Sequence, residues 1–321
     1  MGIKVIKGGM LTTVQDLGRN GYRKDGIIVS GAMDTLALQI GNMLLGNHVA
    51  EAGLECTLLG PKLFFETDQL IAITGGDLSP TVDGLPVKMW RPLFIPKGAT
   101  LSFGAAVKGC RSYLTVFGGF DLPEVLGSYA TYLKAGFGGY KGRALKNDDE
   151  LLFKKVYEDK GDTFKWSADL KLYPDLDDHE IRAMKGPEFD LFTSQSTAGL
   201  FNSNYLISKS ADRMGYRLEG ELLQTIKPKE MLSSAVAFGT VQVTPDGGAI
   251  LLMADHQTTG GYPRILQVIT ADLSKLAQMQ SGQQIRFKLV TIGDARKALL
   301  QRENQLKQLK QALTFKSNSY E

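Results

Sequence analysis

Residues 251–263 hold the side chains of this chain that are best suited to acid–base chemistry. An apolar, strand-like run ends at Met253 and leads directly into Asp, His, Gln and two Thr, followed by a pair of glycines. An imidazole or a carboxylate can move a proton, and hydroxyls and backbone amides can stabilise developing negative charge. His256 is one of only three histidines in the chain. A polar turn after a core strand is the simpler explanation, but we interpret the cluster as a site.

Two other loops place an aspartate close to an arginine in glycine-bearing sequence. Asp16 precedes Arg19 in the first loop, and Asp212 precedes Arg213 in the second. Such pairs are usually ion pairs that fix a loop, but they can also present a cation and a base to a polar substrate.

Residues 136–143 form a glycine-rich segment that carries two cations, Lys141 and Arg143. Backbone amides and cations suit a phosphate or a carboxylate, so the segment is a candidate anion cradle. A flexible barrel loop explains the same composition equally well. The sequence contains no P-loop motif, so we expect any ATP to be bound in another manner or by another chain.

The sequence indicates neither a covalent biotin nor a metal centre. Ala183-Met184-Lys185 matches the start of the biotin attachment motif, but Gly186 follows in place of the expected Met. The chain has no His-Glu-x-x-His and no Cys-x-x-Cys. We therefore expect no biotinyl lysine on this chain and no bound metal.

Composition describes an ordinary globular protein large enough for two domains. The 321 residues are 43% hydrophobic and 22% charged. The net charge of +3 is too small to indicate a nucleic-acid partner. Cys56 and Cys110 lie in apolar or glycine-rich sequence and are expected to be reduced core thiols. With neither a signal peptide nor a membrane span in the sequence, we expect a cytoplasmic protein.

The second half of the chain repeats segments of the first half in the same order, which indicates an old duplication. The matched segments are 3–8 with 181–186, 30–33 with 210–214, 71–77 with 251–256, and 98–103 with 282–287. Asp77 falls near the position that matches His256 and is a candidate for a second, vestigial site.

Short apolar runs bounded by Gly, Pro or Asp predict mostly β-strands. Apolar spacing predicts helices over residues 34–45, 272–279 and 294–315. We expect the last helix to pack on its own protein more readily than on a partner. The predicted organisation is a first unit with extra loops, a surface connector, a second unit, and a helix with a tail, over residues 1–156, 157–180, 181–293 and 294–321.

Four of these motifs, at residues 12–19, 30–34, 210–220 and 256–263, together resemble the biotin-dependent carboxyltransferase family, also called allophanate hydrolase subunit 2-like. This family includes the C subunit of 5-oxoprolinase and the Kip-type antagonist of a sporulation-kinase inhibitor. The resemblance implies a mainly β fold with a few helices, built as two duplicated cyclophilin-like β-barrel units plus a C-terminal helix.

The resemblance implies that the chain is one subunit of an ATP-dependent complex that opens 5-oxo-L-proline to L-glutamate. Its partners would be the A and B subunits of 5-oxoprolinase, the B subunit being similar to the Kip-type kinase inhibitor. One rival is a carboxyltransferase subunit of a biotin-dependent urea or amide carboxylase. The other is a regulator without chemistry that binds a sporulation-kinase inhibitor.

From residue chemistry we assign acid–base work to His256 or Asp255. Oxyanion donors would come from Thr258, Thr259 and the amides of the glycine pair. The expected substrate- or anion-binding residues are Arg213, Arg19, Asp34, Gln257, Gly260, Gly261, Tyr262, Lys141 and Arg143.

Overall fold

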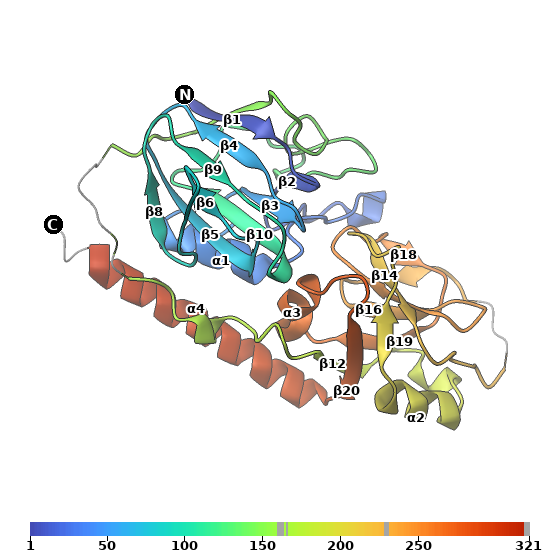
Figure 1. Ribbon diagram of the computed structural model, residues 1–321. Coiled ribbons are helices and arrows are strands. Elements are labelled where there is room, and N and C mark those ends of the chain that lie inside the picture. The colour runs from blue at the N-terminus through green and yellow to red at the C-terminus, as the bar shows by residue number, and fades with distance from the viewer. Residues whose placement is uncertain (159–163, 165, 228–230, 318–321) are drawn as a thin grey trace. The chain divides into compact units, whose positions relative to one another are not determined.

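The computed structural model describes residues 1–158, 164, 166–227 and 231–317 (Figure 1). The chain divides into two compact units. The first comprises Met1–Arg19, Ser30–Tyr173 and Asn304–Glu321, and the second comprises Asn20–Val29 and Pro174–Glu303. Residues 20–29 belong to the second unit. The sequence analysis expected them in the first unit, which it predicted to span residues 1–156.

The described part of the first unit contains two antiparallel sheets that share one core. One sheet has the strand order β11 (Glu150–Leu152), β1 (Gly2–Lys7), β4 (Lys62–Phe65), β9 (Thr100–Ser102), β6 (Thr81–Val82) and β7 (Leu85–Pro86). The other has the order β2 (Leu11–Gln15), β3 (Gly53–Thr57), β10 (Lys108–Val116), β5 (Gln69–Asp77) and β8 (Pro92–Ile95). Alternate residues of both sheets, such as Ile3 and Leu114, are fully buried in this core because successive side chains of a strand face opposite sides.

Helix α1 (Thr35–Leu44) covers the outer face of the five-stranded sheet, where it packs on β5 and β10. The Asp34 carboxylate accepts a hydrogen bond from the Ala37 amide and so caps the helix N-terminus. Gly46, just past the C-terminus, adopts a φ of 68°, which glycine tolerates. The helix predicted over residues 34–45 is therefore confirmed.

In the described part of the second unit, seven strands close into a barrel. Their order is β12 (Glu180–Lys185), β19 (Arg264–Val268), β16 (Thr240–Val243), β17 (Ala249–Leu252), β14 (Gly215–Glu219), β13 (Tyr205–Ile207) and β20 (Gln284–Leu289). A parallel pairing of β12 with β20 completes the closure. A separate two-stranded sheet pairs β15 (Ser234–Ala235) with β18 (Thr259–Gly260). The prediction of a mainly β fold with barrel architecture is confirmed.

Three of the four pairs of repeated segments contain strand residues in both halves, whereas residues 30–33 and 210–214 lie in loops. The matched strands pair differently. Residues 3–7 and 181–185 fall on β1 and β12. Strand β1 pairs antiparallel with both β4 and β11, whereas β12 pairs antiparallel with β19 and parallel with β20. The two units therefore carry similar segments in different sheet topologies.

The remaining helices are α2 (Ser194–Asn202), α3 (Leu273–Ala277) and α4 (Ile292–Ser317). Short 3-10 turns cover Arg23–Asp25, Leu170–Leu172, Phe189–Leu191 and Thr270–Asp272. Helices α3 and α4 confirm two predictions, while α2, capped by Thr193, has too few apolar residues to be recognised from periodicity. No helix in the described residues is both long and apolar enough to cross a membrane.

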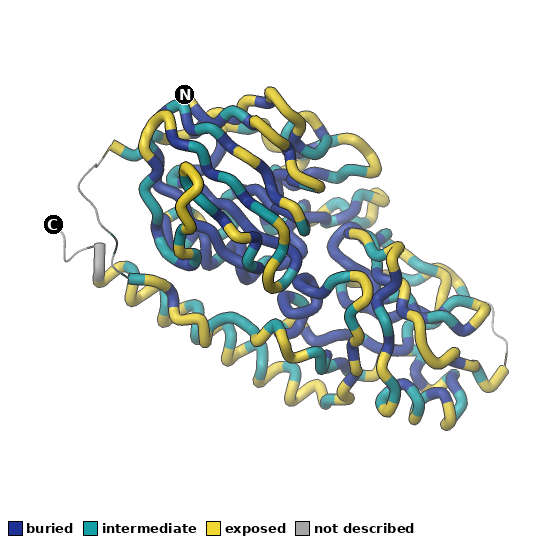
Figure 2. The backbone as a smooth tube through the Cα atoms, in the orientation of Figure 1, coloured by how far each residue is buried: buried dark blue, intermediate teal, exposed yellow. Residues whose placement is uncertain are grey.

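The described residues of segment 157–180 are not a simple surface connector. Tyr157, Trp166 and Tyr173 pack against the buried cluster around α1, and the Ala168 amide donates to the Trp90 carbonyl. Predictions for residues 159–163 and 165 lie outside the described residues. Helix α4 also packs against the buried cluster around α1, through Leu306, Leu309 and Leu313. Exposed and partly buried positions alternate along this helix (Figure 2).

The glycine-rich segment of the first unit offers a test of local packing. Gly142 has a φ of 66°, and a Cβ there would lie 1.9 Å from the Gly136 carbonyl oxygen. Gly136 has a φ of 68° with nothing within 4 Å of its Cβ position. Gly136→Ala should cost about 1–2 kcal/mol of backbone strain, and Gly142→Ala should cost more because of the added clash. Calorimetric unfolding measures both, and equal losses for the two variants would contradict this packing.

Candidate functional site

The loop that follows β17 is buried. Met253, Ala254, Asp255 and His256 each expose no more than 5% of their surface. The Met253 amide donates to the Met214 carbonyl, and the His256 amide donates to the Met253 carbonyl, which closes a tight turn. Buried polar side chains need partners, because an unpaired one costs free energy. This loop is therefore not an ordinary solvated turn, and the partners of its side chains indicate their roles.

Asp255 and Arg213 form a buried, bidentate ion pair. Nε and Nη2 of Arg213 donate to the two Asp255 carboxylate oxygens, each at 2.9 Å. The Asp255 amide also donates to the Arg213 carbonyl at 2.7 Å. Each charge is neutralised by the other, and both side chains are held in one orientation. The pair therefore holds the loop, while the predicted acid–base role of Asp255 and the predicted anion binding by Arg213 stay predictions.

The surroundings of the His256 ring favour its neutral form. Its Nδ1 lies 2.6 Å from the Gln257 carbonyl oxygen. Because a carbonyl only accepts, Nδ1 carries the proton, and in the neutral ring Nε2 keeps its lone pair. Burial lowers the pKa of His256 from its ordinary 6.5, and the positive charge of Arg23 lowers it further. A general base at neutral pH needs this neutral form.

Arg23 lies beside the His256 loop, and the sequence analysis did not predict it. It lies on residues 20–29, which belong to the second unit. Its Nη2 donates to the Val236 carbonyl, and the Val236 amide donates to the Thr258 carbonyl at 3.3 Å. The predicted motif stopped at Arg19, and Tyr22-Arg23-Lys24 carries no spacing that links it to a loop in the second half of the chain.

Gln242 is a second residue missed from the sequence. Its Nε2 donates to the Tyr262 carbonyl at 3.0 Å, and its Oε1 accepts from the Gln257 side chain at 3.3 Å. A Cβ on Gly260 would lie 2.5 Å from the same Nε2, so a larger residue there would displace the end of the Gln242 side chain. Gln242 thus fixes the loop on both sides of Thr258 and Thr259.

The remaining predicted residues of the second unit follow His256 along the loop. Thr258 is half-buried and Thr259 exposed, and the backbone of Thr259 and Gly260 pairs with β15. Gly261 and Tyr262 line a cavity of about 810 Å³ together with Leu223, Met231 and Asp246, among others. His256 and Asp255 do not line this cavity.

Arg19 and Asp34 serve the structure of the first unit. Arg19 is fully buried, where Nε and Nη2 donate to the carbonyls of Val125 and Ala130, and the guanidinium lies 4.7 Å from the Phe137 ring centroid. Asp34 caps α1 and accepts a hydrogen bond from the Tyr173 hydroxyl. Burial and these partners leave neither side chain exposed for an external ligand.

The segment predicted as an anion cradle uses backbone amides in hydrogen bonds within its own loop. The amides of Gly136 and Gly142 donate to the carbonyls of Tyr132 and Gly138. Arg143 forms a bidentate pair with Asp149 at 2.6 and 2.7 Å. Lys141 is exposed and its Nζ lies 4.9 Å from the Tyr140 ring centroid. Asp77 likewise serves locally, because its carboxylate accepts from the Ser79 amide.

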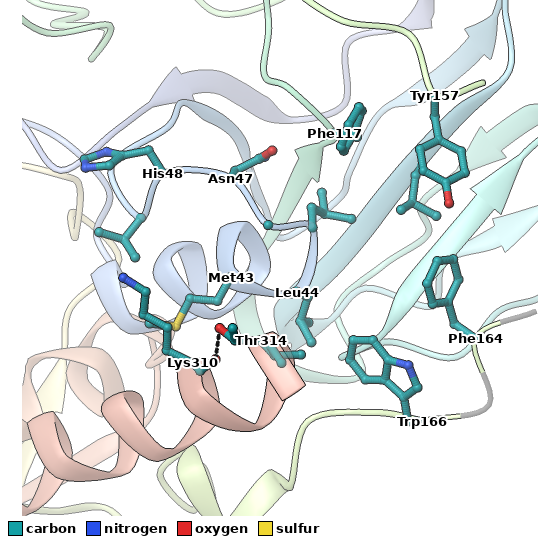
Figure 3. Close-up of a pocket in the computed structure, with 15 residues that line it drawn as sticks. Met43, Leu44, Asn47, His48, Phe117, Tyr157, Phe164, Trp166, Lys310 and Thr314 are labelled. Carbon is teal, nitrogen blue, oxygen red and sulfur yellow. Dashed lines mark hydrogen bonds between the residues drawn. The ribbon is translucent and has the colours of Figure 1, made fainter. Parts of the chain in front are cut away.

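A separate cavity of about 540 Å³ lies in the first unit, and none of the predicted site residues line it (Figure 3). Its lining combines the C-terminal end of α1, the aromatic side chains of Phe117, Tyr157, Phe164 and Trp166, and one face of α4. The lining is largely apolar, and it also includes His48 and Lys310.

Removal of one partner of the Arg213–Asp255 pair should destabilise the second unit strongly. Asp255→Asn leaves a buried guanidinium without its counter-charge, which costs about 3–5 kcal/mol. Lys288→Gln, which removes a pair with Glu180 whose lysine is 56% exposed, should change stability by about 1 kcal/mol or less. Urea unfolding compares the two variants. A stable but inactive Asp255→Asn chain would instead support an acid–base role for Asp255.

Comparison with known proteins shows which family the chain resembles. The family model described as "Carboxyltransferase domain, subdomain A and B" matches residues 25–289. The chain is 41% identical over 307 residues to the C subunit of 5-oxoprolinase from Escherichia coli, covering 96% of this chain and 97% of the relative. It is 40% identical over 294 residues to the same subunit from Haemophilus influenzae, covering 92% of each.

The fold agrees with a solved structure. The crystal structure of Kluyveromyces lactis urea carboxylase is similar with a TM-score of 0.90 and 30% identity over 96% of this chain. The chain spans only 29% of the length of that protein, so the similarity concerns one part of it. By sequence and by fold, the chain belongs to the carboxyltransferase domain family with subdomains A and B.

Proposed function

We propose that the chain is the C subunit of an ATP-dependent 5-oxoprolinase complex, which opens 5-oxo-L-proline to L-glutamate with the A and B subunits as partners. The observation that carries the proposal is the end-to-end similarity to the C subunit of 5-oxoprolinase, at 41% identity over 96% of this chain and 97% of the relative. Both cysteines are buried thiols, which accords with a complex in the cytoplasm.

A lactam is a resonance-stabilised amide, and ATP supplies activation when it phosphorylates the lactam oxygen. We assign His256 as the base that takes a proton from the attacking water through Nε2, because its tautomer and its low pKa favour the neutral ring. The Thr258 and Thr259 hydroxyls are the proposed donors to the lactam oxygen, and the pairing of the Thr259 backbone with β15 holds this part of the loop in place.

ATP binding is assigned to a partner subunit. The chain has no P-loop motif, and the glycine-rich segment 136–143 uses amides and Arg143 in its own hydrogen bonds. Around His256 the described side chains provide a base and hydroxyls, and the guanidiniums of Arg213 and Arg264 are already paired with carboxylates.

A biotin-dependent urea or amide carboxyltransferase subunit is the second candidate. The family model and the similarity to urea carboxylase favour it. A neutral His256 would then remove a proton from the acceptor amide nitrogen. Biotin would arrive on another chain, because Lys185 ends strand β12 and its Nζ lies 4.5 Å from the Phe189 ring centroid.

The two candidates separate in one assay on the purified complex. Glutamate formation from 5-oxoproline is measured with and without ATP, and again after addition of avidin. The proposal expects ATP-dependent glutamate formation that avidin leaves unchanged. Inhibition by avidin supports the carboxyltransferase, and full activity of the A and B subunits alone contradicts the proposal.

His256→Ala in the complete complex should lower kcat by about 100-fold or more, the usual contribution of a positioned general base. His48→Ala is the matched control, because His48 is an exposed histidine of the first unit and should leave the rate unchanged. Normal activity of a folded His256→Ala complex would refute the catalytic assignment.

The activity should fall on the acid side with an apparent pKa below 6.5. Burial lowers the pKa of His256 from 6.5, so the ring is neutral above its folded pKa and is protonated below it. The same shift adds stability that is complete above pH 6.5 and is lost as the pH falls through the folded pKa. A pH–rate profile and urea unfolding as a function of pH check both signs, and an acid limb above pH 6.5 would contradict the assignment.

A further inference from the structure

Arg23 differs from the other arginines that surround the candidate base. In the second unit Arg213 pairs with Asp255 and Arg264 pairs with Glu188, each through two hydrogen bonds between charged groups. Arg23 is half-buried, and among the residues that the structure describes no carboxylate lies within ion-pair distance of it. Its side chain donates a hydrogen bond to the Val236 carbonyl.

The guanidinium is anchored beside the His256 loop. Val236, which accepts from Arg23, donates its own amide to the Thr258 carbonyl. The neighbouring residue Ala235 pairs with Thr259 across the small sheet and accepts from Arg264. The charge of Arg23 is also close enough to lower the pKa of His256.

Of the two charged side chains that shift the pKa of His256, Asp255 is already paired with Arg213, whereas Arg23 forms no ion pair among the described residues. The pairs Arg213–Asp255 and Arg264–Glu188 are each neutral overall, and His256 is neutral at neutral pH. On the same segment as Arg23, Lys24 and Asp25 are exposed and of opposite sign. Arg23 therefore sets the net charge next to the base, and its guanidinium has further N–H groups with which to bind an anion.

We propose that Arg23 binds the carboxylate of the substrate beside His256, so that the site takes amides and lactams that carry a carboxylate near the reacting carbonyl. A guanidinium matches a carboxylate with two parallel hydrogen bonds, which fixes the position of the ring as well as its charge. This inference rests on the proposed function, because 5-oxoproline is a lactam with such a carboxylate, whereas urea carries none.

The test uses the complete complex and two lactams, 5-oxo-L-proline and 2-pyrrolidinone, which is the same ring without the carboxylate. Arg23→Gln should raise KM for 5-oxoproline about 10- to 100-fold, the effect of losing a hydrogen bond between charged groups. KM for 2-pyrrolidinone, or its inhibition constant where turnover is absent, should stay unchanged. Arg23→Lys should restore part of the loss, because it keeps the charge without the planar fork.

Lys24→Gln is the matched control, since it removes the same charge from the neighbouring exposed residue. It should leave KM for both lactams unchanged. An active Arg23→Gln complex with the wild-type KM for 5-oxoproline overturns the inference, as does an equal loss for both lactams.

A second measurement on the chain itself separates failure of this inference from failure of the proposed function. NMR titration of His256 should show a higher pKa in Arg23→Gln than in wild type, because a nearby cation is removed. In wild type, 5-oxoproline should also raise the pKa of His256, and in Arg23→Gln it should not. If the wild-type complex is inactive, this titration still decides the inference. The inference is refuted if neither Arg23→Gln nor the addition of 5-oxoproline to wild type changes the pKa of His256.

Discussion

The second unit depends on the buried ion pair between Arg213 and Asp255. Burial of either charge alone costs several kcal/mol, and the bidentate geometry offsets much of this cost. The pair also ties the segment that precedes β14 to the segment that follows β17, through the Asp255 amide and the Arg213 carbonyl. Because the turn at Met253 is held this way, His256 sits at a defined place with its Nδ1 directed to the Gln257 carbonyl.

The hydrogen-bond partners of an arginine in this protein decide whether its charge is used within the chain or is left for a ligand. Arg19, Arg143 and Arg213 all satisfy carbonyls or carboxylates of their own chain. Arg23 donates to a carbonyl and meets no carboxylate among the described residues. A charge that is already paired has little to offer a substrate, whereas a half-buried cation with open donors gains when an anion arrives.

The fold class and three helices were predictable because they rest on local patterns. The helix over residues 34–45 has an acidic cap, an apolar face and a terminal glycine, each of which acts within a few residues. Helix α2 escaped because its apolar face is short. The packing of Trp166 and Tyr173 on the first unit was also missed, since an Asp- and Lys-rich segment shows no periodicity that would mark its aromatic residues as buried.

The sequence by itself determined that residues 251–263 are a polar cluster following an apolar strand, and it offered His256 or Asp255 for acid–base work. Only the tertiary structure decided what these residues do. It paired Asp255 with Arg213, removed His256 from water and brought Arg23 next to Val236 from the far end of the chain. The partners and the burial of a side chain depend on which segments of the chain are in contact in the fold. Residue types and their spacing along the sequence do not directly specify those contacts.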